Sequence, residues 1–328
     1  MANDFSYADQ ATQEMVQRAA TDQIKTVWDR YQEMQPQCGF GTLGLCCRHC
    51  SMGPCRIDPF GDGPRTGVCG ATGDTIAARH LVRMIAAGAA SHSDHGRSIA
   101  HTLLLISEDP KSAYSIKDPN KLRAVAEVYG IDTKGKDTDS LVGEVAHATL
   151  QEFGRPTGTA EMAETAPPAR VKKWKDYGIM PRAIDREVVE SMHRTHIGVD
   201  ADYKNLIKQG LRTSLADGWG GSMIGTELSD VIFNTPKPLR TKTNLGVLKD
   251  DYVNVVVHGH EPTLSDIIAI ISKNDDVTKK AEAVGAKGLN LSGICCTANE
   301  ILMRHGIPIA GSYMQQELAI MTGVVDMM

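Results

Sequence analysis

The sequence predicts a multidomain protein, with a mostly α-helical N-terminal domain over residues 1–235 and an α/β Rossmann-like parallel-sheet domain over residues 236–328. Three observations indicate this fold class. Domains typically hold about 150 residues, so the 328 residues suggest two domains. Apolar residues recur at helical spacing up to about residue 235. Beyond that point, short β-branched runs alternate with helical segments.

The N-terminal domain is expected to begin with a helical arm over the first forty residues, where Val16, Ile24 and Trp28 recur at helical spacing. Asp74 is a suitable N-cap for a helix that continues to Ile106, with a break at Gly88 as an alternative. The same patterns predict helices over 120–129, 138–153, 184–192 and 203–215, and a proline-containing linker or long surface loop over 154–170.

The C-terminal domain is predicted from two successive strand–loop–helix units. The first has a β-branched strand over 252–257, a His-Gly-His loop and a helix over 264–271. The second has a strand over 288–294, the pair Cys295 and Cys296, and a helix over 297–304, before a third strand over 307–310. Ligands of parallel α/β sheets gather at the carboxyl ends of strands, so we expect His260 and the cysteine pair at such ends. The chain stops as it approaches another strand, so the predicted sheet is incomplete.

The charge balance argues against a nucleic-acid partner. Lys and Arg number 35 and Asp and Glu number 40, which gives a formal net charge of -5, whereas nucleic-acid-binding domains are typically basic. The polar start of the chain lacks the basic flank and apolar run of a secretory signal. No stretch approaches the roughly 18 apolar residues of a membrane helix. These observations predict a cytoplasmic protein without a membrane span.

Six of the eight cysteines fall between positions 38 and 69. In a reducing compartment, metal binding is a better interpretation of such a window than disulfide bonds. The spacing Cys47-x2-Cys50-x4-Cys55-x13-Cys69 suits a [4Fe-4S] cluster, because close thiolates can wrap one side of the cluster and a distant fourth can close it. Zinc is the alternative for four sulfurs, although the paired CxxC motifs of zinc sites are absent.

Cys38 and Cys46 remain as two ligands where a cluster needs four. A two-fold axis beside this loop would let two copies of the chain supply four thiolates to one shared cluster, which predicts a homodimer. The alternative is a pair of ordinary free thiols.

A second group consists of His92, His95, Ser98 and His101, each three residues after the last. On a helix these residues form a stripe about 14 Å long, along which imidazoles can pass protons. The alternative is a solvated helix face. A third group, His258, His260, Cys295 and Cys296, mixes imidazole with thiolate in the predicted sheet, a combination that suits iron, nickel or zinc. It has too few donors to complete a metal site.

Together and in this order, the three groups resemble those of the nickel-containing carbon monoxide dehydrogenases of anaerobes. The stretch CGFGTLGLCCRHCSMGPCRIDPFGDGPRTGVCGA, residues 38–71, is similar to that family's N-terminal cluster motif. Further similar segments are SHSDHGR, MHRTHIGVDADYKNL, LADGWGGSMI, VVVHGHEP, GICCTANE and QELAIMTG. The resemblance covers nearly the whole chain.

The resemblance implies roles for these residues. Cys38 and Cys46 would bind a cluster that bridges two subunits, and the remaining four cysteines of the window would bind a [4Fe-4S] cluster within each chain. His260 and Cys296 would ligate the iron outside the cubane of a Ni-Fe-S active-site cluster, with Cys295 as a neighbouring thiol. His92, His95 and His101 would conduct protons, with Ser98 standing where many members carry a further histidine.

The resemblance also implies the reaction CO + H2O giving CO2, two protons and two electrons, with ferredoxin as acceptor and acetyl-CoA synthase as a further partner. Family members are nearly twice as long, and their other active-site cysteines and acid–base groups lie in the second half. We therefore expect this chain to be the N-terminal portion of such an enzyme, or one part of a split enzyme, and to be inactive alone. The alternative is a non-catalytic iron-sulfur electron-transfer subunit.

Overall fold

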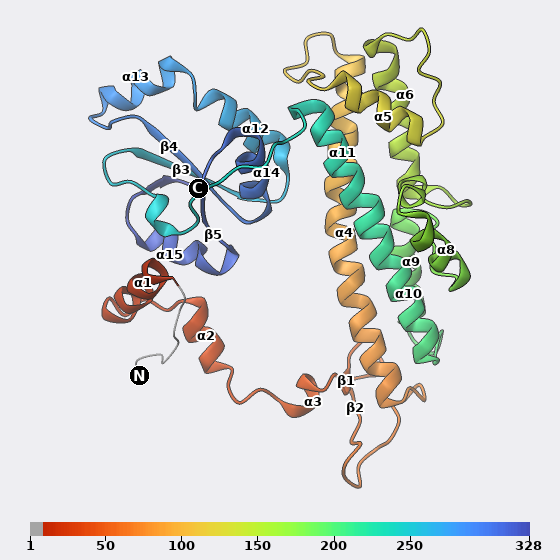
Figure 1. Cartoon of the computed structure of the whole chain (residues 1–328). Helices are drawn as coiled ribbons and strands as arrows, with labels where there is room; N and C mark the ends of the chain where they lie inside the picture. The colour runs from red at the N-terminus through yellow and green to blue at the C-terminus, as the bar shows by residue number, and fades with distance from the viewer. Residues whose placement is uncertain (1–8) are drawn as a thin grey trace. The chain divides into compact units, whose positions relative to one another are not determined.

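The structure is a computed structural model that describes residues 9–328. The chain divides into two compact units. Residues 37–234 form the helical unit, and residues 9–36 together with 235–328 form the sheet unit (Figure 1). No helix within residues 9–328 is both long and apolar enough to cross a membrane.

Residues 9–36 differ from the predicted organisation, because they belong to the sheet unit and not to the helical domain. Val16 packs in one core cluster with Val256 and Leu318. The backbone N–H of Val27 donates to Glu317 Oε2 at 2.7 Å, and Arg30 forms an ion pair with the same carboxylate. Helical periodicity shows which face of this arm is buried, but it carries no information about which unit covers that face.

The helical unit is built around α4, Gly73–Glu108, a helix of 36 residues that contacts α6, α9, α10 and α11 (Figure 1). The other helices and short strands of the unit are α3 Gly39–Thr42, β1 Cys46–Cys47, β2 Cys55–Arg56, α5 Pro119–Val128, α6 Thr138–Gly154, α7 Glu161–Glu164, α8 Pro168–Asp176, α9 Ile184–Arg194, α10 Tyr203–Ala216, the π-helix η1 Asp217–Gly221 and α11 Ser222–Phe233. Fully buried Ile99, Leu103, Leu141 and Leu228 belong to the main core that α4 shares with its neighbours.

The start and the middle of α4 differ in detail from the prediction. Thr72, not Asp74, is the N-cap, and its side chain accepts from the backbone N–H of Thr75. Asp74 lies in the first turn, where its charge is favourable near the positive end of the helix dipole. The helix is unbroken at Gly88, which lies on the exposed face with no atom close to it, so the residue is tolerated there.

The segment 154–170 also differs from the prediction of a linker or surface loop. It contains α7, and Ala160, Met162 and Ala163 in it are fully buried. The two alanines pack in a small core cluster with Trp174. The prolines stop longer helices in this segment, but these apolar residues still find a core.

The sheet unit contains the predicted parallel sheet, with strand order β5-β4-β3-β6. Its elements are α1 Gln10–Thr21, α2 Val27–Glu33, the 3-10 helix η2 Leu245–Val247, β3 Val253–Gly259, α12 Pro262–Ile271, α13 Asp275–Ala283, β4 Leu289–Ile294, α14 Cys295–His305, β5 Ile309–Gly311, the 3-10 helix η3 Tyr313–Gln315, α15 Gln316–Met321 and β6 Val325–Met327. β3, β4 and β5 overlap the three predicted strands.

The buried side chain of Asn254 on β3 ties the sheet to its surrounding loops. Its amide donates to the carbonyls of Lys249 and Val324, and its Oδ1 accepts from Asn290 on β4. Its backbone N–H donates to Asp326 Oδ2 at 2.7 Å, which fixes the edge strand β6.

Candidate metal centres

The short antiparallel pair β1–β2 positions the first cysteines. Cys47 lies opposite Cys55, and Cys46 lies opposite Arg56. Successive side chains of a strand point to opposite faces, so the neighbours Cys46 and Cys47 face apart. Cys47 lines an enclosed pocket, whereas Cys46 lines a separate, open pocket on the surface with His80 and Met84. Adjacent cysteines can therefore serve two different groups.

Four cysteines line the enclosed pocket. They are Cys47, Cys50, Cys55 and Cys69, and we call this space the four-cysteine pocket. All four are free thiols. Ile76, Arg79 and Ile197 complete part of its wall.

Hydrogen-bond donors point at the sulfur atoms of this pocket. The backbone N–H of Val68 donates to Cys55 Sγ at 3.4 Å, and Arg79 Nη1 donates to Cys69 Sγ at 3.6 Å. Burial raises the pKa of the Cys69 thiol, but the N–H of Ala71 and the Arg79 guanidinium outweigh this effect, so the pKa lies below its usual value. Donors of this kind stabilise thiolates, the form that binds metal.

Glycines beside the cysteines allow the backbone to approach the sulfur atoms closely. A Cβ on Gly67 would lie 3.4 Å from Cys55 Sγ, and a Cβ on Gly53 would lie 3.1 Å from the Cys47 carbonyl oxygen. Gly70 adopts a φ of +81°, which lets the chain turn after Cys69. Four thiols, sulfur-directed N–H groups and close backbone together fit a four-thiolate iron-sulfur cluster.

Cys38 and Cys46 do not line the four-cysteine pocket. Cys38 is exposed at the N-cap of α3, where the backbone N–H groups of Gly41 and Phe40 lower the pKa of its thiol. Gly41 also lines the open pocket that contains Cys46. His80 Nε2 lies 2.9 Å from the Cys46 carbonyl oxygen and fixes that backbone.

The histidine stripe lies on α4 as predicted, and its first member has a partner that the sequence did not suggest. His92 Nδ1 lies 2.6 Å from Asp217 Oδ1 in the π-helix η1. A Cβ on Gly96 would lie 2.4 Å from the Gly221 carbonyl oxygen, so only glycine allows α4 and η1 to approach this closely. π-helical turns of this kind are frequent at functional sites.

The rest of the stripe runs from a half-buried to an exposed position. His95 is half-buried and lies near Gly225 of α11, whereas Ser98 and His101 are exposed. The stripe therefore runs along α4 from His92, which pairs with Asp217, to the exposed His101.

In the sheet unit, His260 directly follows β3 and Cys295 directly follows β4, at the carboxyl ends of two paired parallel strands. His260 and Cys296 are exposed, and Cys295 is half-buried. Cys295 Sγ lies 3.2 Å from His258 Nε2. Cys295 has a φ of +68°, a left-handed conformation that is uncommon outside glycine.

Within residues 9–328, no three His, Cys, Asp or Glu side chains converge closely enough to hold a single metal ion. This holds for the sheet-unit residues His260, Cys295 and Cys296 as well.

The sequence missed several residues beside the cysteines. Arg79 and His49 line the four-cysteine pocket, and the His49 ring lies 4.7 Å from that of His80. Burial and the nearby Arg83 lower the pKa of His49 to about 4, so its ring is neutral at neutral pH. For Asp217 a signal existed, because it lies in the segment LADGWGGSMI. The sequence held no such signal for Arg79, because a helical pattern does not show which of its arginines is buried.

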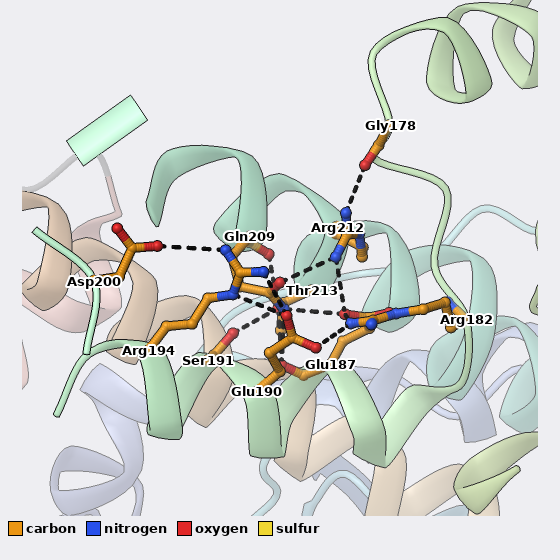
Figure 2. A network of polar contacts seen from close by, with 10 residues as sticks. All are labelled: Gly178, Arg182, Glu187, Glu190, Ser191, Arg194, Asp200, Gln209, Arg212 and Thr213. Carbon is orange, nitrogen blue, oxygen red and sulfur yellow. Dashed lines mark hydrogen bonds and ion pairs between the residues drawn. The ribbon is translucent and has the colours of Figure 1, made fainter. Parts of the chain in front are cut away.

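A network of charged side chains fixes the loop that follows α9 (Figure 2). Arg182 donates to both oxygens of the fully buried Glu187 at 2.8 Å, and it also pairs with Glu190. Arg194 binds Glu190 and lies 3.4 Å from Asp200 in the loop. The Asp200 carbonyl in turn accepts from Arg79 Nη2 at 2.9 Å, so this network supports the four-cysteine pocket from outside.

The chain is similar to known proteins over nearly its whole length. Residues 45–328 match the model of the Prismane/CO dehydrogenase family, and the chain belongs to that family. Within it, the chain is homologous to the nickel-containing carbon monoxide dehydrogenases. Carbon monoxide dehydrogenase 1 of Methanosarcina mazei is 54% identical over 98% of this chain and 51% of its own length.

Two solved structures are similar throughout the chain. A nickel-free crystal structure of carbon monoxide dehydrogenase from Thermococcus sp. AM4 has a TM-score of 0.93 and 54% identity, and covers 99% of this chain and 53% of its own. An acetyl-CoA synthase/carbon monoxide dehydrogenase, described with NiZn[Fe4S4] and NiNi[Fe4S4] clusters in its alpha subunits, has a TM-score of 0.92 and 42% identity, and covers 98% of this chain and 48% of its own. The chain thus spans about half the length of these relatives.

Proposed function

We propose that this chain is the N-terminal portion of a nickel-iron-sulfur carbon monoxide dehydrogenase, and that it carries the electron-transfer clusters and part of the active-site ligand set. The observation that supports this most directly is the four-cysteine pocket, in which Cys47, Cys50, Cys55 and Cys69 surround one enclosed space. Such a donor set suits a [4Fe-4S] cluster, which accepts and releases one electron at a time.

Cys38 and Cys46 supply half of a second cluster in this proposal. Neither lines the four-cysteine pocket: Cys38 is exposed, and Cys46 lines a separate, open pocket. Two copies of the chain, related by a two-fold axis, complete the four ligands, so the protein acts as a homodimer.

At the sheet edge, His260 and Cys296, with Cys295 beside them, contribute ligands to the active-site metals. Imidazole nitrogen and thiolate sulfur suit iron and nickel. When bound, such metals supply Lewis-acid activation of water and of the carbon substrate. The reaction of the whole enzyme is CO + H2O giving CO2, two protons and two electrons.

The chain's own contribution to proton movement lies on α4. The carboxylate of Asp217 accepts a hydrogen bond from His92 Nδ1–H, which orients the ring and leaves Nε2 as the nitrogen that can accept a proton. His95 and His101 continue the stripe toward the exposed part of the helix. Ser98 relays through its hydroxyl and water between them. We assign the electrons to a ferredoxin-type acceptor, with acetyl-CoA synthase as a further partner.

A non-catalytic electron-transfer subunit is the second candidate. It is favoured by one contrast: the cysteine window has the full donor set of a cluster, whereas His258, His260, Cys295 and Cys296 at the sheet edge do not converge on one metal ion. Both candidates predict that this chain binds iron-sulfur clusters, and both predict that it does not oxidise CO alone.

Anaerobic reconstitution with iron and sulfide tests the proposal. We expect brown protein whose iron and sulfide contents correspond to one cluster per chain plus one shared cluster per dimer, with no CO-dependent reduction of viologen. Adding the polypeptide that completes the ligand set should restore CO oxidation if the chain is part of the enzyme, whereas an electron carrier stays inactive. Colourless, iron-free chain after reconstitution contradicts both candidates.

The shared cluster has its own test. Changing Cys38 and Cys46 together to Ser should remove about half a cluster of iron per chain and weaken the dimer, because ligand binding and assembly are linked. The matched control is Cys295→Ser, which leaves the window intact. Unchanged iron and unchanged dimer affinity in the double variant contradict sharing.

A further inference from the structure

Arg79 is an unusual arginine, because it is almost completely buried beside four thiols. Its side chain is 2% exposed and lines the four-cysteine pocket. Nη1 reaches Cys69 Sγ at 3.6 Å and Nη2 donates to the Asp200 carbonyl at 2.9 Å. Its Nε is buried without a hydrogen-bond partner within the described chain.

The charge of this guanidinium lacks a carboxylate partner among residues 9–328, since its partners there are a thiol sulfur and a backbone carbonyl. A buried, unpaired cation is costly, and proteins retain one where an anion compensates it. The half-buried Arg182 shows the usual solution in this same unit, because the carboxylates of Glu187 and Glu190 pair with its guanidinium. For Arg79 the position of the missing anion is the four-cysteine pocket.

Resting on the cluster proposed above for this pocket, we propose that Arg79 compensates the charge of that cluster and raises its reduction potential. Four thiolates make a [4Fe-4S] cluster anionic, and one-electron reduction adds a further negative charge. A cation fixed against the Cys69 sulfur stabilises the reduced form more than the oxidised form, because the attraction grows with the negative charge. Net charge and hydrogen bonds to sulfur are the terms that set cluster potentials.

The geometry holds the guanidinium in place. The carbonyl of Asp200 anchors Nη2, and Asp200 is held by the Arg194 ion pair at 3.4 Å. Figure 2 shows how this pair joins the network around Glu190. The anchor on Nη2 thus lies outside the pocket, while Nη1 faces the Cys69 sulfur.

Redox titration of the reconstituted chain tests the inference. Cys38→Ser and Cys46→Ser are introduced into every sample, so that the cluster of the four-cysteine pocket is the one measured. In this background, Arg79→Gln removes the charge at similar size, Arg79→Lys retains it, and Arg123→Gln is the matched control. Arg123 donates to the carbonyls of Thr133 and Lys136, as Arg79 does to Asp200, but far along the chain from the cysteines.

We expect Arg79→Gln to retain its iron and, at the parent's midpoint potential, to lower the reduced-to-oxidised ratio of the cluster by at least about tenfold, which is a fall of about 59 mV. Arg79→Lys should stay within about threefold of the parent ratio, because the charge is what sets the shift. Arg123→Gln should match the parent. An Arg79→Gln protein with full iron content and the parent potential overturns the inference, as does an equal shift in Arg123→Gln.

Iron content separates the remaining outcomes. If Arg79→Gln assembles no cluster but Arg79→Lys assembles one at the parent potential, the positive charge is required and the inference stands. If both variants are iron-free with native circular dichroism, charge compensation is refuted, because a retained cation failed to support the cluster. If the parent chain itself binds no iron, the proposed function fails and the inference falls with it.

Discussion

The crossing of α4 over the π-helix η1 depends on two glycines, and one methyl group tests it. In Gly96→Ala the new Cβ would lie 2.4 Å from the Gly221 carbonyl oxygen and 3.3 Å from the Phe153 ring. The first of these atoms belongs to the backbone, so no rotamer change relieves the contact. The two helices must separate, and the separation also loosens His92, one turn away from Gly96, from Asp217.

The free-energy cost of this steric contact can be estimated by comparison with Gly88, a second glycine of α4. Gly88 has no atom within 4 Å of its potential Cβ, so Gly88→Ala should stabilise the unit by about 0.5–1 kcal/mol through helix propensity alone. Gly96→Ala gains the same propensity but also pays for overpacking, typically about 1–3 kcal/mol. The difference between the two variants isolates the steric cost, which we place at about 3 kcal/mol because backbone must move.

Urea unfolding of the helical unit measures this difference. Trp174 and Trp219 pack 5.6 Å apart in that unit and report on it by fluorescence, and Trp28→Phe removes the signal of the sheet unit. We expect the midpoint of Gly96→Ala to fall below that of the parent and the midpoint of Gly88→Ala to rise slightly. Equal midpoints in the two alanine variants would refute the close approach of α4 and η1.

Three further predictions concern other parts of the chain. Burial raises the pKa of Glu152, so this carboxyl stabilises the fold below its unfolded pKa and loses that contribution as the pH rises. Glu152→Gln can still accept from the Met162 N–H, and its stability relative to the parent should increase by up to about 1.4 kcal/mol per pH unit above 4.5. A stability difference that does not change with pH contradicts the raised pKa. Asn254→Ala should cost about 3 kcal/mol and speed hydrogen exchange in β6, because Lys249 and Val324 lose their partner, while unchanged exchange there would contradict this role. Asp217→Asn should shift His92 away from the Nδ1–H tautomer, as read by nitrogen NMR, and an unaltered tautomer would show that the 2.6 Å contact does not orient the ring.

The sequence predicts the repeating parts of this fold well, because helices and parallel strands have characteristic periods. β3 and β4 lie within one or two residues of the predicted strands, and α4 and α6 match helical patterns. Periodicity does not show which part of the chain a helix packs against. The arm at 10–33 shows this, since its helices were predicted correctly but its place in the sheet unit was not.

The candidate sites show the same division. Ligand types and spacings are visible in the sequence, so the cysteine window and the histidine stripe could be proposed from it. Arg79 and Asp217 act at ten and 125 residues from the groups they contact, and no local pattern connects them. Asp217 reaches His92 because the distant π-helix η1 packs against α4, and Arg79 reaches Cys69 because the segment before α4 folds back onto the first turns of the helix, and packing determines both contacts.

At the sheet edge, the adjacent cysteines Cys295 and Cys296 have different surroundings. The left-handed φ of +68° at Cys295 costs about 1 kcal/mol or more in a non-glycine residue, and it persists because the surrounding turn imposes it. A Cβ on Gly293 would lie 2.6 Å from Ala298 Cα, so strand β4 turns into α14 with no spare room. This conformation places Cys295 Sγ at 3.2 Å from His258 Nε2 and next to Cys296. The two cysteines therefore differ in conformation as well as in exposure, because Cys295 is left-handed and half-buried whereas Cys296 is exposed.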